Sequence, residues 1–143
     1  IGVGVNVNVA PVIPAINDEG IFDVVQAVAD AGALNATYIV VRLNGHNGKI
    51  FEDWVTKNFP DRANKVLNQI KTMHGGQLND SQYGRRMRGE GKFSEMIKLQ
   101  FAIAKRRFMY GRKMPLLDSS LYENTRNEIL LQQKENENQL RLF

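Results

Sequence analysis

Residues 3–9 read Val-Gly-Val-Asn-Val-Asn-Val, an alternation of apolar and small or polar side chains with a period of two. This period is typical of a β-strand, because successive side chains of a strand point to opposite faces of its sheet. The valines therefore line one face, and the glycine and the two asparagines line the other. Pro11 and Pro14 are predicted to end the strand, since proline cannot donate a hydrogen bond to a neighbouring strand.

A helix and a second strand follow in the sequence. Asn17 and Asp18 are suited to cap the start of the helix, and Gly32 is placed to end it. Apolar residues recur between them at helical spacing, at Ile21, Phe22, Val24, Val25 and Val28. Residues 37–43 then read Thr-Tyr-Ile-Val-Val-Arg-Leu, a β-branched run that is typical of a buried strand. The order of strand, helix and strand predicts a βαβ unit with parallel strands.

The polar face of this sheet allows two interpretations. In a barrel of parallel strands, the valines would meet the surrounding helices, and Asn6 and Asn8 would face a lumen that holds a polar ligand. Alternatively, the asparagines lie on a face exposed to solvent. Arg42 ends the second strand, at the edge where α/β proteins place their ligands, and a buried arginine requires a partner. The candidates for that partner are a cofactor carboxylate, a substrate phosphate and a structural acidic side chain.

The rest of the chain is predicted to be helices joined by loops, without internal repeats. A loop is expected at 44–48, followed by a short helix with an apolar stripe of Ile50, Phe51, Trp54 and Val55. The next helix runs from Pro60 to Met73, and its apolar residues are Ala63, Val66, Leu67, Ile70 and Met73. After a loop at 77–91, a helix at 94–109 carries Ile97, Phe101, Ala104 and Phe108 on one face, and a helical or frayed tail begins at 132. Two parallel strands do not make a complete sheet. Because the sequence also begins directly with strand-like residues, we expect it to be a piece of a longer chain.

The composition excludes several kinds of site. The sequence contains no cysteine, which excludes disulfides, thiolate zinc sites, cysteine nucleophiles and cysteine-bound iron–sulfur clusters within the chain. His46 and His74 are its two histidines, and neither occurs in a metal-binding spacing. No segment has the features of a signal peptide or of a membrane span. We therefore expect a cytoplasmic protein with no metal site and no membrane partner.

Positive charge is concentrated in residues 85–113. This segment contains ten lysines and arginines and two acidic residues, and so carries +8 in a chain whose net charge is +4. The candidates for contact with nucleic-acid phosphates are Arg85, Arg86 and Arg88 in the predicted loop and Lys105, Arg106 and Arg107 on the predicted helix. The alternative is that the loop arginines have structural roles and that the helix charges form a solvated face.

Several short strings occur in the order found in a known family. They are APVIPAIND at 10–18, YIVVRL at 38–43, FEDW at 51–54, FPDRA at 59–63, KVL at 65–67, GG at 75–76, DS at 80–81, RMRG at 86–89 with Gly91, and LDSSL at 117–121. Together they resemble a bacterial radical SAM family related to spore photoproduct lyase, whose members are described as DNA repair photolyases. The resemblance covers residues 3–122. Ala15 departs from it, because the family usually has glycine at that position.

The resemblance implies an α/β fold, namely the C-terminal fragment of a partial (β/α)6 radical SAM barrel followed by a helical extension. Residues 1–45 would form the last two strands and the helix between them. Residues 46–122 would form the extension with the basic loop, and residues 123–143 a polar helical or frayed tail.

The resemblance also implies a parent enzyme that uses a [4Fe–4S] cluster and S-adenosylmethionine. The cysteines that hold the cluster would belong to an N-terminal part of the same chain, which is the first expected partner. The fragment alone is then expected to bind no cofactor and to be inactive. Its candidate cofactor contacts, carried over from the family, are Val12, Ile13, Val41 and Arg42.

Three functions stay open at this point. The chain is a fragment of a radical SAM enzyme that acts in DNA repair, a nucleic-acid-binding module that uses residues 85–113, or a structural domain. In the last case, its exposed sheet edge would pair with a partner or with a second copy of the chain.

Overall fold

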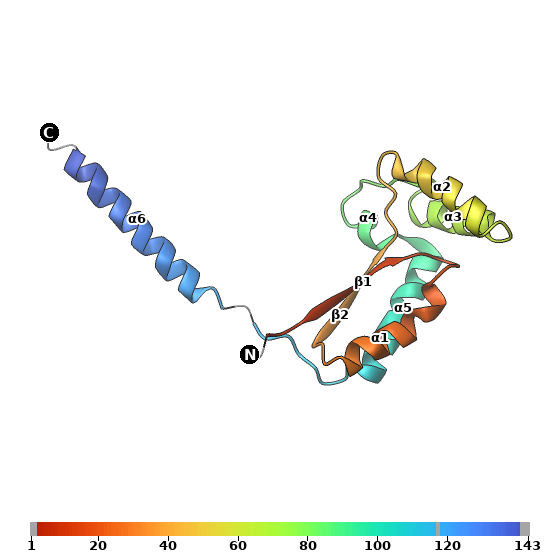
Figure 1. The fold of residues 1–143 in the computed structure, drawn as a ribbon, viewed down its shortest axis with the longest axis horizontal. Coiled ribbons are helices and arrows are strands. Elements are labelled where there is room, and N and C mark those ends of the chain that lie inside the picture. The colour runs from red at the N-terminus through yellow and green to blue at the C-terminus, as the bar shows by residue number, and fades with distance from the viewer. Residues whose placement is uncertain (1–2, 117, 141–143) are drawn as a thin grey trace.

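The structure is a computed structural model that describes residues 3–116 and 118–140 (Figure 1). Its elements in chain order are β1 (Asn6–Val12), the 3-10 turn η1 (Asp18–Gly20), α1 (Ile21–Asp30), β2 (Asn35–Val40), α2 (Asn47–Asn58), α3 (Ala63–Met73), α4 (Arg85–Arg88), α5 (Gly91–Phe108) and α6 (Ser120–Leu140). The fold is therefore α/β. The first two residues of the predicted 1–45 unit, Leu117 of the LDSSL string and the last three residues of the predicted tail lie outside the described residues.

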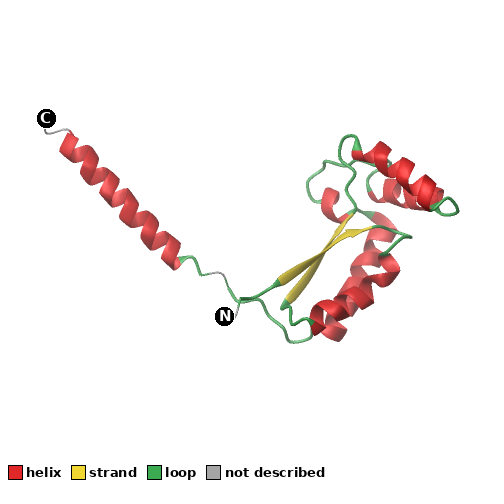
Figure 2. Cartoon of the chain, viewed as in Figure 1, coloured by secondary structure: helices red, strands yellow, loops and turns green. Residues whose placement is uncertain are grey.

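The two strands are parallel and hydrogen-bonded to each other, which confirms the predicted βαβ order (Figure 2). The prediction that Pro11 ends the first strand is wrong, because β1 continues to Val12. The register shifts between Val9 and Val12, where three steps along β1 match two along β2. Proline is tolerated at such an irregularity because a residue there does not have to donate to the partner strand.

One face of the sheet is covered by α1 and α5, which pack against each other (Figure 1). The buried side chains of β2 on this face are Ala36, Tyr38 and Val40. Val7 and Val9 of β1 are half-buried against the same core. The predicted valine face therefore meets the helices, but only within β1, since Val3 and Val5 precede the strand and are exposed.

The structure confirms the predicted C-terminal end of α1 but not the predicted side-chain cap at its N-terminal end. Gly32 has a φ of 83° and donates to the Ala29 carbonyl at 2.9 Å, while Ala33 donates to the Val28 carbonyl at 3.2 Å. This is the predicted glycine stop. Asn17 stands at the N-cap position of η1, the turn that leads into α1, but it makes no side-chain cap hydrogen bond. Its amide oxygen instead accepts from the Ile13 backbone N–H in the turn after β1.

The helices α2 and α3 pack side by side beyond the C-terminal end of the sheet (Figure 1). The predicted apolar face of α3 is confirmed, since its members Ala63, Val66, Leu67, Ile70 and Met73 are all buried. The apolar stripe predicted for α2 is confirmed only in part. Val55 is buried and Phe51 half-buried, but Ile50 and Trp54 are 65% and 39% exposed.

The predicted loop 77–91 contains one helical turn, α4, and leads directly into α5. The predicted apolar face of α5 is confirmed at Ile97, Phe101 and Ala104, which are buried, whereas its fourth member, Phe108, is half-buried. The predicted tail is helical, and α6 projects away from the rest of the chain (Figure 2). Within the described residues, no helix has both the length and the apolar character that a membrane crossing requires.

Candidate functional site

A basic groove runs between β2 and α5. It consists of two adjoining hollows of about 430 and 240 Å³, which share Tyr38, Arg88 and Lys98. The larger hollow also reaches Ser94 at the start of α5, and the smaller one reaches Lys105 further along that helix. We call this surface the β2–α5 groove. It combines three cationic side chains with an aromatic floor.

Two of these cations are held in place by contacts within the chain. The Arg88 guanidinium lies 4.2 Å from the centre of the Tyr38 ring, a cation–π contact. Tyr38 in turn packs at 4.8 Å against Phe101 of α5. The Lys105 ammonium donates to the Asn35 side chain at 2.6 Å. Both cations are therefore held against residues of β2.

Ser94 fixes the backbone at the head of the groove. Its hydroxyl is buried and lies 2.8 Å from the Arg88 carbonyl and 3.1 Å from the Gly89 carbonyl. Gly89 has a φ of 72° and a ψ of 179°, a conformation that is essentially restricted to glycine. A Cβ atom there would lie 2.9 Å from the end of the Met73 side chain. The turn that presents Arg88 thus depends on glycine and on the serine hydroxyl.

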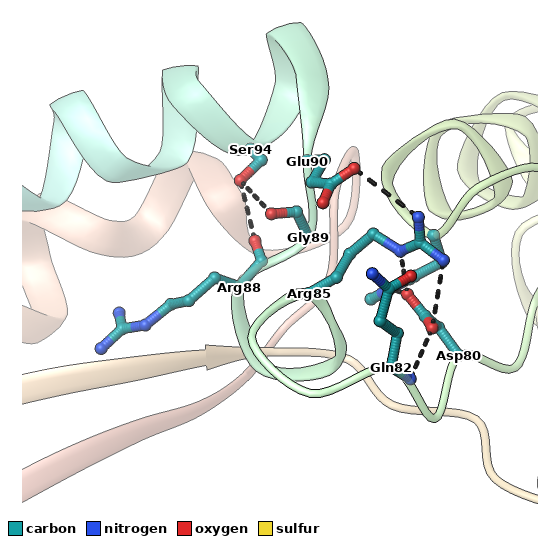
Figure 3. Close-up of polar contacts among 8 residues, drawn as sticks. Asp80, Gln82, Arg85, Arg88, Gly89, Glu90 and Ser94 are labelled. Atoms are coloured by element: carbon teal, nitrogen blue, oxygen red, sulfur yellow. Dashed lines mark hydrogen bonds and ion pairs between the residues drawn. The ribbon is translucent and has the colours of Figure 1, made fainter.

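Arg85 does not face this groove. It bonds to both carboxylate oxygens of Asp80 and lies 3.6 Å from the Glu90 carboxylate, whereas Arg88 points away from this cluster toward the sheet (Figure 3). The backbone N–H of Gln82 also donates to Asp80, at 2.9 Å. Of the two roles considered for Arg85, these contacts favour the structural role over contact with nucleic-acid phosphates.

The same contacts determine the charge state of Asp80. The hydrogen bond from Arg85, followed by that from the Gln82 backbone, lowers the pKa of the Asp80 carboxyl from 3.8 to about 2. The carboxylate in turn raises the pKa of Arg85. His74 is buried with its Nδ1 3.5 Å from Asp80, and neither of its ring nitrogens has a hydrogen-bond partner within the described structure. These contacts hold together the two ends of the segment 77–91 that the sequence predicts as a loop.

The other predicted basic residues are dispersed. Arg86 lies beside Tyr83, with 5.7 Å between the guanidinium and the ring centre. Arg106 and Arg107 are exposed on α5, and neither lines the β2–α5 groove. The structure thus brings Arg88 and Lys105 together and separates the other four candidates from them.

The four candidate cofactor contacts lie at the C-terminal ends of the two strands. Val12 and Val41 are 2% and 5% exposed, and the Val41 N–H donates to the Val12 carbonyl at 2.9 Å. Their side chains belong to the core and their facing backbone groups are already paired. Ile13 and Arg42 are half-buried at the same edge. They are the two of the four that can reach a ligand without a change in the core.

The chain fits the cofactors of the resembling family poorly. It has no cysteine, so it cannot ligate an iron–sulfur cluster through thiolates. Among residues 3–116 and 118–140, no three histidine or acidic side chains are arranged to hold a metal ion. Of the four candidate cofactor contacts, only Ile13 and Arg42 keep partly exposed side chains at the ends of β1 and β2.

Two groove residues, Tyr38 and Lys98, were not predicted from the sequence. Lys98 and Lys105 are seven residues apart, which places them on the same face of a helix, so their spacing on α5 was a usable signal. Tyr38 carried no such signal, because its contact with Arg88 joins positions fifty residues apart.

Comparison with known protein families, with curated proteins and with solved structures finds no match to this chain.

Proposed function

We propose that the chain is the C-terminal βαβ unit and helical extension of a larger parallel α/β barrel, of the radical SAM class that its sequence resembles. The observation that supports this proposal is the incomplete sheet. Two parallel strands are covered by helices on one face, and the other face carries a hydrogen-bonded row of Asn6, Thr37 and Asn8, with 3.3 Å at each step. Parallel sheets normally have more strands and both faces covered.

A hollow beside β1 favours the same proposal. It has a volume of about 250 Å³ and is lined mainly by apolar side chains, including Val9, Ile16, Ile21 and Val24. Val24 is 43% exposed although it lies on α1 next to the sheet. A further strand and helix beside β1 would cover these residues. The N-terminal part of the same chain is the proposed occupant, and a second copy of the chain is the alternative.

The test uses the natural gene that contains this segment and the protein that this gene encodes. We expect a longer chain with three closely spaced cysteines upstream of Ile1. After anaerobic purification it should contain iron and sulfide, and it should release 5′-deoxyadenosine from S-adenosylmethionine when a reductant is supplied. The 143-residue chain, prepared in parallel, is the control and should bind no iron. A gene product that begins at Ile1, or a longer one without cysteines, would contradict the proposal.

The β2–α5 groove favours a second function, contact with the phosphates of single-stranded nucleic acid. Its cations Arg88, Lys98 and Lys105 lie along one side of β2, as a row of phosphates requires. One acidic residue, Glu95, also lines the groove, and it lies 3.3 Å from Lys98. The groove keeps a net positive charge despite this pair.

Salt dependence tests this second function. Three neutralised phosphates on a single strand predict a slope of about −2 in log K against log salt, or about 20-fold weaker binding at 200 mM than at 50 mM salt. The triple variant with glutamine in place of Arg88, Lys98 and Lys105 should show a slope of log K against log salt that is close to zero. The matched control places glutamine at the exposed Lys49, Lys65 and Lys134, which removes the same charge elsewhere. Equal slopes for the two triple variants would exclude the groove.

A further inference from the structure

Arg42 has an unusual environment for an arginine. It follows the buried residues Val40 and Val41 at the end of β2 and is itself half-buried. Its Nε atom is buried without a hydrogen-bond partner. Its Nη1 atom lies 3.8 Å from the Met87 sulfur, and a thioether is a weak acceptor. Within the described part of the chain, Arg42 forms no ion pair.

Arg86 also has a buried Nε without a hydrogen-bond partner, but its guanidinium lies beside the Tyr83 ring and not at the end of a strand. By contrast, Arg85 and Arg112 have oxygen partners. Arg85 has the carboxylates of Asp80 and Glu90. Arg112 donates to the Ala29 and Ala33 carbonyls at 2.8 and 2.7 Å, at the end of α1. A guanidinium is always charged and strongly favours oxygen partners, so burial of one of its nitrogens without such a partner is unfavourable.

The position of Arg42 suggests what would satisfy it. In open parallel sheets, ligands bind outside the carboxyl ends of the strands, and Arg42 lies at this end of β2. The planar fork of a guanidinium matches the two oxygens of a carboxylate or phosphate. Arg88 follows Met87, the contact of Arg42, and adds positive charge over Tyr38, four residues before Arg42.

From these contacts we propose that Arg42 is the anchor of a small-ligand site that binds an oxyanion, a phosphate or a carboxylate group, at the C-terminal end of β2. The site does not require the radical SAM proposal, because its anchor is a residue of this chain; in the barrel of that proposal, the carboxylate of the cofactor is one such ligand. The ligand's oxygens replace the thioether contact at Nη1 and compensate the charge. Arg42 therefore contributes to binding and not to the stability of the free protein.

The test combines thermal unfolding with anion titration of the whole 143-residue chain. Inorganic phosphate and acetate are the two probes, each compared with sodium chloride at equal ionic strength. We expect at least one of them to raise the Tm of the wild-type chain by roughly 4 °C at ten times its Kd. Arg42→Met should abolish this shift while its Tm without the probe equals or exceeds that of the wild type. Lys65→Met is the control, because it removes one exposed positive charge on α3, and its Tm should still rise on addition of the probe.

The outcomes separate the sources of the anion. A response to phosphate alone assigns a phosphate ligand, and a response to acetate assigns a carboxylate. Equal responses of wild type and Arg42→Met, or no response of the wild type, overturn the proposal.

A second variant covers the case in which Arg42→Met does not fold. Arg42→Lys keeps the charge and loses the fork, so we expect roughly 10-fold weaker binding of the effective probe. The Arg42 Nε–H resonance in nitrogen-15 NMR spectra, assigned by its loss in Arg42→Lys, should shift on addition of that probe. An unmoved resonance together with unchanged affinity in Arg42→Lys contradicts the site.

Discussion

Replacement of Ala15 by glycine should make this protein more stable. Ala15 lies in the turn after β1 and has a φ of 59°, in the left-handed region that favours glycine. Its place is determined by the surrounding turn, in which Ile16 and Asn17 donate to the Ile13 carbonyl. The positive φ is therefore a physical reason to expect glycine to fit this position better than alanine.

The magnitude follows from two opposing terms. An L-residue in the left-handed region costs about 1–2 kcal/mol relative to glycine. Glycine loses about 0.5–1 kcal/mol through its greater freedom in the unfolded chain, and removal of the half-buried Ala15 methyl costs about 0.4 kcal/mol more. The net gain for Ala15→Gly is therefore small, about 0.3 kcal/mol.

A matched control makes the effect measurable. Ala27 is exposed within α1, so Ala27→Gly has the same entropy cost without relief of strain and should lose about 1 kcal/mol. The two variants should therefore differ by about 1–1.5 kcal/mol in free energy of unfolding, and by roughly 5 °C in Tm.

Urea unfolding, followed by the fluorescence of the single tryptophan Trp54 and by helical circular dichroism, measures this difference. The two probes must give coincident transitions for the comparison to hold. If Ala15→Gly loses as much stability as Ala27→Gly, the backbone at position 15 is not left-handed in solution, and the reasoning is refuted.

Three further predictions concern the body of the protein. Because the pKa of Asp80 lies at about 2, below its usual 3.8, its stabilising contacts are complete above about pH 4 and are lost as the pH falls toward 2. The Tm difference between wild type and Asp80→Asn should therefore shrink between pH 4 and pH 2, while Asp53→Asn, at an exposed pair, should show little difference at either pH. Gly89→Ala should lose about 2–4 kcal/mol of unfolding free energy, measured in urea, because its Cβ would meet Met73 at 2.9 Å in a glycine-only conformation; a loss below about 1 kcal/mol would show that this turn can relax. Ile97→Ala should lose about 2–5 kcal/mol in the same assay because Ile97 is fully buried, and a neutral result would mean that α5 does not pack on the body as described.

Local patterns in the sequence were sufficient for most of the elements. The alternation at 3–9 and the β-branched run at 37–43 predicted the two parallel strands, although the actual strands are displaced by two or three residues. The boundaries moved because pairing between strands, and not the side-chain pattern of either strand alone, decides where a strand ends. The turn α4 was missed because its four residues are too few to show a helical period.

The candidate site was less accessible to sequence reasoning. Six basic residues were predicted as phosphate contacts, and the structure places only Arg88 and Lys105 in one groove. Arg85 instead pairs with Asp80, a contact that the loop composition did not indicate. A high local charge shows where cations are frequent in the chain. It does not show which of them have acidic partners.

Four properties could be predicted from the sequence: the βαβ order, the glycine stop of α1 at Gly32, the apolar face of α3 and the exclusion of thiolate chemistry. These properties depend on residues close in the chain or on composition. Three other properties became visible in the folded chain: Arg88 lies over Tyr38, Lys105 reaches Asn35, and Arg42 has no oxygen partner among the described residues. Each of these contacts depends on how α4 and α5 pack against β2, and that packing joins positions up to seventy residues apart.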